Sequence, residues 1–166
     1  MKKAVWCGAI AAAAIALCST PAFAQATATG SVTVTANVNA KAKLTLGAAS
    51  VTFNDADPDV TPLLTATSAL SVDVKARTAA ASTVTLTVQA GGDLDNGSAT
   101  IGINNLTWAA TGTNFVAGTM ATTASTLASY AGGGNFSGLQ TYRLVNSWNY
   151  ATGTYTATIT YTLTAP

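Results

Sequence analysis

Apolar and polar residues alternate along most of the chain, and the alternation is clearest near its C-terminal end. In residues 153–165 every second position is apolar, namely Tyr155, Ala157, Ile159, Tyr161 and Leu163. Threonine fills the positions between them. Successive side chains of a strand point to opposite faces, so the pattern predicts a strand with one apolar face and one threonine face. Threonine also favours strands because it is β-branched.

The same alternation recurs upstream, separated by turn-forming residues. It predicts further strands in residues 31–46, 50–53, 69–75, 82–89, 101–108, 114–120 and 139–148. Residues 122–130 could hold a turn or two of helix at most, and residues 131–138, with three consecutive glycines, are expected to be flexible or turning. About eight strands with regularly spaced turns are typical of an Ig-like antiparallel β-sandwich. We therefore predict one all-β domain in residues 25–166.

Residues 31–46 form an unusually long alternating stretch. A strand of this length would extend about 50 Å, well beyond a usual strand. One explanation is a strand that bends or changes sheets near residues 37–39. The other is that residues 31–38, which we call the donor segment, leave their own domain and complete the sheet of a neighbouring copy. Val32, Val34 and Val38 would then fill pockets in the recipient.

Residues 1–24 have the features of a secretory signal peptide. Lys2 and Lys3 precede an apolar run in residues 4–17, and residues 21–24 read Pro-Ala-Phe-Ala, which fits cleavage after Ala24. Cys18 raises the alternative of a lipidated cysteine. The pattern predicts export to the periplasm, the outer cell surface or the medium, and no later stretch is long enough to span a membrane.

Composition narrows the functional classes. Both cysteines, Cys7 and Cys18, lie in the expected leader, so the mature chain would have no disulfide. The seven Lys and Arg, two of them in the leader, nearly balance the six acidic residues, all of which are aspartates. The sequence predicts no large excess of positive charge that would bind phosphates, so nucleic acid is a poor partner. A low net charge permits self-association.

Catalysis is not expected. The chain has no histidine and no glutamate, and its cysteines lie in the leader, which removes the common general base, metal ligand and thiol nucleophile. A hydroxyl nucleophile would need Lys41, Lys43 or Lys75 as its base. All three lie on predicted strands opposite the apolar positions, so we expect them in solvent. We predict a non-enzymatic protein without a cofactor.

Two groups of residues suggest binding sites. Asp55, Asp57 and Asp59 alternate like the first ligands of a calcium loop, but Val60 and Ala66 stand where an EF-hand has glycine and glutamate, which favours a solvated turn. Four aromatic residues could form a stacking platform for sugar rings, although the interpretation that they fill the core and corners is favoured. They are Trp108, Trp148, Tyr142 and Tyr150.

The C-terminal end resembles that of WxL-type cell-surface domains. The resemblance lies in residues 150–155 and 159–166, which contain a G-x-Y strand start and an aromatic-x-Leu motif, here Tyr161-Thr162-Leu163. Residues 106–110 (LTWAA) resemble the upstream tryptophan motif of those domains. The overall layout is similar to secreted fimbrial subunits. Both resemblances imply a secreted β-sandwich that associates with the cell surface or with partner proteins.

We therefore expect an exported structural protein of the cell surface that acts through strand-edge contacts with copies of itself or with other surface proteins. A non-catalytic module that binds cell-wall glycan is the alternative. The residues expected to make contacts are Val32, Val34, Val38, Trp108, Trp148 and Tyr150.

Overall fold

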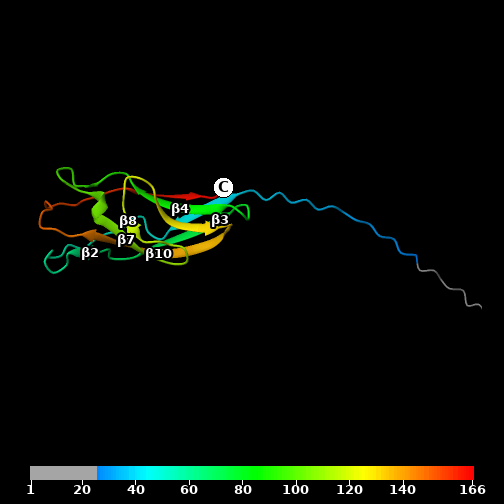
Figure 1. The fold of residues 1–166 in the computed structure, drawn as a ribbon, viewed down its shortest axis with the longest axis horizontal. Helices are drawn as coiled ribbons and strands as arrows, with labels where there is room; N and C mark the ends of the chain where they lie inside the picture. Colours follow the sequence, from blue (N-terminus) through cyan, green and yellow to red (C-terminus); the bar gives the residue numbers. More distant parts are fainter. Residues whose placement is uncertain (1–25) are drawn as a thin grey trace, which may run out of the picture. The chain divides into compact units, whose positions relative to one another are not determined.

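A computed structural model describes residues 26–166 of the chain (Figure 1). The chain divides into two units, Met1–Ala36 and Asn37–Pro166, and the second unit, which we call the body, holds every strand that the structure describes. The expected leader and its cleavage site after Ala24 lie outside the described residues. Within residues 26–166, no helix has both the length and the apolar character needed to cross a membrane.

The regular secondary structure of the body consists of antiparallel strands, apart from one short 3-10 helix. Eleven strands are present where the sequence predicts about eight, and the all-β class is confirmed. The largest sheet has the order β1 (Lys41–Leu46), β3 (Leu70–Arg77), β10 (Gly134–Val145), β7 (Leu106–Thr111) and β8 (Gly118–Thr119), with β2 (Leu63–Thr65) also paired to β10. An Ig-like topology in particular stays a prediction.

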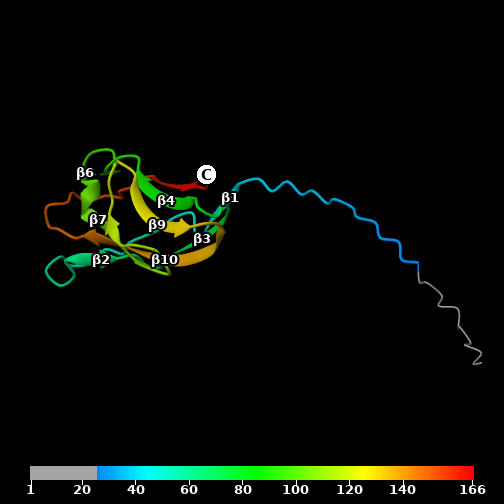
Figure 2. The same ribbon diagram turned by 45° about the vertical axis from the view of Figure 1, so that its right-hand side comes forward.

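A second sheet lies opposite the first. It has the order β11 (Ile159–Thr164), β4 (Thr83–Ala90) and β9 (Ser125–Ala131), and Figure 2 shows β4 and β9 side by side. A small sheet pairs β5 (Leu94–Asp95) with β6 (Thr100–Ile101), and the short 3-10 helix η1 (Ile103–Asn105) leads into β7.

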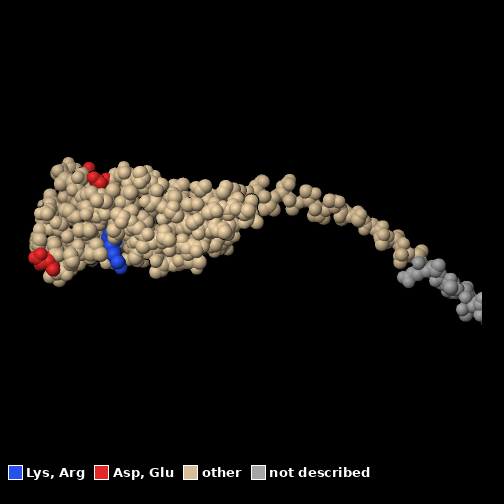
Figure 3. Space-filling view, viewed as in Figure 1, with Lys and Arg blue, Asp and Glu red and all other residues tan. Residues whose placement is uncertain are grey.

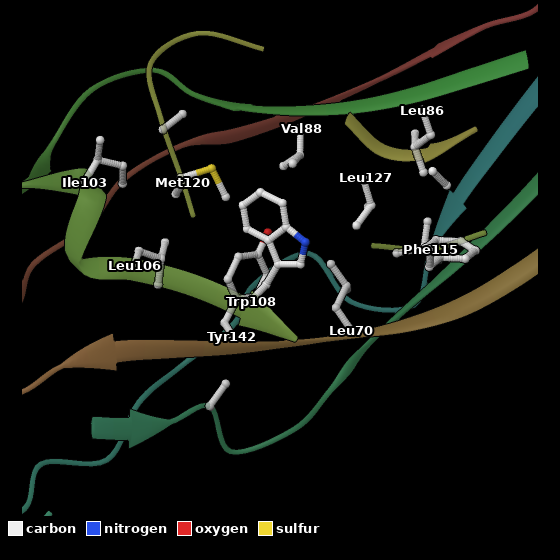
Figure 4. Close-up of a cluster of buried hydrophobic side chains, with 14 of the residues drawn as sticks. Leu70, Leu86, Val88, Ile103, Leu106, Trp108, Phe115, Met120, Leu127 and Tyr142 are labelled. Carbon is white, nitrogen blue, oxygen red and sulfur yellow. The ribbon is translucent and has the colours of Figure 1, made fainter. Parts of the chain in front are cut away.

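The apolar positions of the alternating strands meet in one core. Val84, Leu86 and Val88 of β4 are completely buried, as the sequence predicts. Trp108 of β7 is only 3% exposed, and Figure 4 shows it between Val88 and Leu127 on one side and Leu70 and Tyr142 on the other. Its indole nitrogen donates a hydrogen bond to the carbonyl of Val116 over 2.9 Å. This bond satisfies the indole N–H, which burial would otherwise leave without an acceptor.

The last strand is shorter than the alternation predicts. It begins at Ile159 rather than near Gly153, because its partner β4 ends at Ala90 and leaves the preceding residues without a continuous ladder. The predicted facing is nevertheless confirmed, since the apolar positions pack against the core and the threonines are exposed. The apolar residues are Tyr155, Ala157, Ile159, Tyr161 and Leu163.

The predicted strand in residues 31–46 is wrong before Lys41. Residues 26–40 are in no strand, and all of them are exposed. Alternation gives a segment two faces, but a strand is stable only when a neighbouring strand pairs with its main chain and covers its apolar face. The structure provides such a neighbour, β3, only for residues Lys41–Leu46.

Four smaller predictions are corrected. Residues 50–53 form no strand, and residues 122–130, expected to be turning or weakly helical, contain most of β9. Residues 114–120 hold only the two-residue strand β8, because Gly112 and Asn114 have positive φ angles of 114° and 64° that turn the chain just before it. Residues 131–138, expected to be flexible, already belong to β10 from Gly134 onward.

Candidate functional site

One side of the sandwich is closed, and the opposite side is open. On the closed side, β8 pairs with β7, Phe115 bridges to Ala128 of β9, and the amide of Ala90 donates to the carbonyl of Ala121, so this segment links both sheets. On the other side, β1 ends the larger sheet and β11 ends the smaller one. These two strands contact each other, but neither has a second hydrogen-bonded neighbour among the described strands.

A groove of about 990 Å³ continues this open side beyond the ends of β1 and β11. Its rims are residues 46–58, which begin at the last residue of β1, and residues 146–157, which lie between β10 and β11. Its floor is made of core side chains from both sheets, namely Leu64, Leu70, Leu106, Tyr142, Leu144, Ile159 and Tyr161. We call it the seam groove. It gives access from outside to the apolar interior of the sandwich.

Many main-chain N–H and C=O groups on both rims of the seam groove have no hydrogen-bond partner in the described structure. Within residues 48–56, the main-chain hydrogen bonds of the described structure are two: the carbonyl of Thr52 accepts from the amide of Thr67, and the carbonyl of Ala56 accepts from the side chain of Asn146 on the other rim. Within residues 150–158, Thr156 exchanges two bonds with Asp95, and most other main-chain groups have no main-chain partner in the described structure. Such rims offer donors and acceptors to an added strand.

A small polar cluster lies on the groove floor and joins the two sheets. The hydroxyl of Tyr161 on β11 donates to the side-chain oxygen of Gln140 on β10, which is completely buried. The hydroxyls of Tyr142 and Tyr161 are 2.5 Å apart. A hydroxyl carries one hydrogen, so Tyr142 donates to Tyr161. The cluster fixes where β11 sits across from β10.

Burial shifts the acidity of these phenols. It raises the pKa of Tyr142 to about 12, although hydrogen bonds to Tyr161 and Gln140 act in the opposite direction. Burial also raises the pKa of Tyr161, and a charge on Tyr142 would raise it further. Both groups therefore stay neutral at physiological pH and act as hydrogen-bonding groups, not as acids or bases.

The outer end of the seam groove is aromatic and acidic. Trp148 is 68% exposed and donates its indole N–H to a carboxylate oxygen of Asp59 over 3.1 Å. Tyr150 is half-buried in the same rim, and burial raises its pKa. An exposed indole held in place by a carboxylate can stack on a flat apolar surface, including the face of a sugar ring.

The three candidate calcium ligands do not converge. Within residues 26–166, no three carboxylate, imidazole or thiol groups lie in an arrangement that could hold a metal ion. One carboxylate oxygen of Asp57 accepts the amide of Asp59 over 2.9 Å, which is a turn interaction. Asp59 binds Trp148 instead. The geometry agrees with a solvated turn.

Charged residues are unevenly distributed over the body. Four of its basic residues lie on β1 and β3, where Lys41 faces Arg77 and Lys43 faces Lys75. We call these four residues the basic cluster. Asp73 on the same face of β3 offsets one of the four charges. At the other end of the body, Asp55 and Asp57 line the seam groove, and Figure 3 shows acidic side chains at that end.

The predicted contact residues therefore separate into three environments. Val32 and Val34 are each 87% exposed and Val38 is 65% exposed, all outside any strand. Trp108, which the sequence analysis places among the contact residues, is buried in the core, and so is Tyr142, so the favoured interpretation that the aromatic residues fill the core holds for these two. Trp148 and Tyr150 lie on the groove rim.

The sequence analysis missed the groove itself. The sequence predicts strands in residues 50–53 and from Gly153 onward, which are parts of the two rims, whereas the structure has no strand in residues 47–58 or 146–158.

Comparisons with protein families, with curated proteins and with solved structures found no match. The resemblance to WxL-type domains and to fimbrial subunits therefore stays a prediction.

Proposed function

We propose that this chain is an exported structural subunit of the bacterial cell surface, fimbria-like, which binds other surface proteins by adding its donor segment to their sheets. The observation that carries the proposal is the donor segment itself. Its valines alternate with polar residues as in a half-buried strand, yet Val32 and Val34 are 87% exposed. A valine contributes about 1.5–3 kcal/mol when it moves from water into an apolar pocket.

The rest of the chain supports a structural role. The signal-peptide pattern in residues 1–24 directs the chain out of the cytoplasm. The body contains antiparallel sheets with two edge strands, β1 and β11, that suit strand addition. The buried tyrosines stay neutral at physiological pH, and the lysines of β1 and β3 are exposed, so neither group supplies a base for catalysis.

Removal of residues 26–37 tests this function. We expect the shortened protein to keep the circular-dichroism spectrum of an antiparallel sheet and to sediment as a monomer at concentrations where the mature chain associates.

A matched pair of substitutions gives a second test. Val34→Asp and Thr35→Asp add the same charge on opposite faces of the donor segment. Val34→Asp should abolish association, whereas Thr35→Asp should leave it within about twofold, because only the valine face enters an apolar pocket. An unfolded deletion variant, or equal effects of the two substitutions, would contradict the proposal.

Glycan binding is a second candidate, favoured by the exposure of Trp148 and its bond to Asp59. Retention on insoluble polysaccharide measures it. Binding that is lost in Trp148→Ala, with folding and association unchanged, would support a glycan site at the outer end of the seam groove. Equal retention of the unsubstituted protein and the Trp148→Ala variant, or no retention of either, would reject glycan binding at this site.

A further inference from the structure

The seam groove has the properties of an acceptor for an extended apolar strand. Its floor consists of aliphatic and aromatic core residues, and its two rims are the loop that follows β1 and the segment that leads from β10 into β11. Few main-chain groups of the rims are paired within the body. A strand placed in the groove would gain main-chain hydrogen bonds at a rim and would cover the floor with every second side chain.

The donor segment matches these properties. Residues 31–38 have no charged side chain, and Val32, Val34, Ala36 and Val38 share one face. Eight residues in a strand span about 26 Å. No glycine or proline interrupts residues 31–46, and the residues there that favour turns are Asn37 and Asn39.

The charges of the body favour a contact between opposite ends. Lys41 and Lys43 of the basic cluster come shortly after the donor segment, separated from it by Asn39 and Ala40, and Arg77 of that cluster donates to the carbonyl of Asn39 over 2.9 Å. The seam groove instead carries Asp55 and Asp57 in its rim. A basic surface beside the donor and an acidic surface beside the acceptor attract each other and disfavour contacts between like ends.

We propose that the seam groove of one molecule binds residues 31–38 of a second copy of the same chain. The inference rests on the proposed function and adds the partner and the place of binding. Each copy has one donor segment and one seam groove, and the two are different surfaces. The contact is therefore heterologous, and it joins copies head to tail into an open filament or a closed ring.

Cysteine pairs test the location directly, because the mature chain has no cysteine of its own. One protein carries Val32→Cys, Val34→Cys or Val38→Cys in turn, which covers the possible registers of the donor. The second carries Ala157→Cys in the groove rim, or as its control Ser129→Cys, which is exposed on β9. The two proteins are mixed and oxidised gently. We expect at least one donor variant to form a disulfide with Ala157→Cys about tenfold faster than with Ser129→Cys.

The outcomes separate this inference from the proposed function. If removal of residues 26–37 abolishes association but no donor cysteine prefers Ala157→Cys, the donor function stands and the seam groove is rejected as its acceptor. If the removal leaves association unchanged, both proposals fail. A chain carrying both Val34→Cys and Ala157→Cys that closes its disulfide within one molecule, at a rate independent of concentration, would also overturn the inference, because the groove would then bind its own arm.

Discussion

The hydroxyls of Tyr142 on β10 and Tyr161 on β11 lie 2.5 Å apart, and this contact joins the two main sheets beneath the seam groove. The hydroxyl of Tyr161 in turn donates a hydrogen bond to the buried side-chain oxygen of Gln140. Three side chains from two strands therefore hold the edge strand β11 at a fixed position across the core. The groove depends on that position, because residues 146–157, which lead into β11, form one of its rims.

Tyr161→Phe should destabilise the fold. The substitution keeps the ring but leaves the buried oxygen of Gln140 without its donor, which typically costs about 1–3 kcal/mol. Urea denaturation followed by circular dichroism measures the change. Tyr155→Phe is the matched control, since that hydroxyl donates to the carbonyl of Ala151 at an exposed position and its loss should cost less than about 1 kcal/mol. Equal losses in the two variants would show that the cluster does not secure β11.

The stability of the body should fall steeply in alkaline solution. Burial raises the pKa of Tyr130 and of Tyr142 to about 12, and that of Tyr161 is raised as well. Above pH 10 the unfolded chain loses phenolic protons that the folded chain keeps. The stabilisation from these groups is therefore complete below pH 10 and is lost as the pH rises from about 10 through about 12.

Each such group contributes at most about 1.4 kcal/mol per pH unit to the slope of the unfolding free energy. Urea denaturation at a series of pH values from 9 upward measures that slope. Tyr161→Phe should make it shallower because one titrating group is gone. A slope that is identical in the two proteins would mean that Tyr161 is already ionised or exposed in the folded state.

Gly138→Ala should destabilise the centre of the larger sheet. Gly138 lies in β10, and an added methyl carbon would stand 2.6 Å from a ring carbon of Phe115 and 2.6 Å from the carbonyl oxygen of Thr111. Overpacking of this kind costs about 1–3 kcal/mol. Gly92→Ala is the control, because nothing lies within 4 Å of the added atom there. Thermal unfolding midpoints compare the variants, and an unchanged midpoint for Gly138→Ala would place Phe115 elsewhere.

Charge reversal in the basic cluster should weaken association if copies join head to tail. Lys43→Glu removes a positive charge beside the donor, where it would face the acidic groove rim of the next copy. Arg143→Glu makes the same change at an exposed position of β10 outside the cluster. Sedimentation at low salt should show an association constant lowered about threefold or more for Lys43→Glu only, and the difference should shrink at high salt. Equal constants for both variants would argue against this charge pairing.

The alternation predicted side-chain facing better than strand length. Val84, Leu86 and Val88 are buried, and the threonines of β11 are exposed, because the period of two is a property of any extended segment. Where a strand begins depends on its neighbours. Residues 31–40 alternate as well as β11 does, yet they have no strand beside them in the described structure.

The groove could not be predicted from the sequence for a similar reason. It arises where the open side of the sandwich continues past the ends of β1 and β11, and those ends are set by pairing with β3 and β4. Trp108 and Trp148 illustrate the same limit. Trp108 lies within β7 and Trp148 follows the end of β10, and the packing of the strands places the first in the core and leaves the second exposed on the rim.

Hydrogen–deuterium exchange of the mature protein tests the central claim most directly. Samples below and above the concentration of association are compared peptide by peptide. We expect the amides of residues 31–38 and of the rim residues 154–157 to become protected together, at least about tenfold, and only in the associated sample. Rapid exchange of residues 31–38 at every concentration would contradict the account, and so would equal protection of these residues in the dilute monomer.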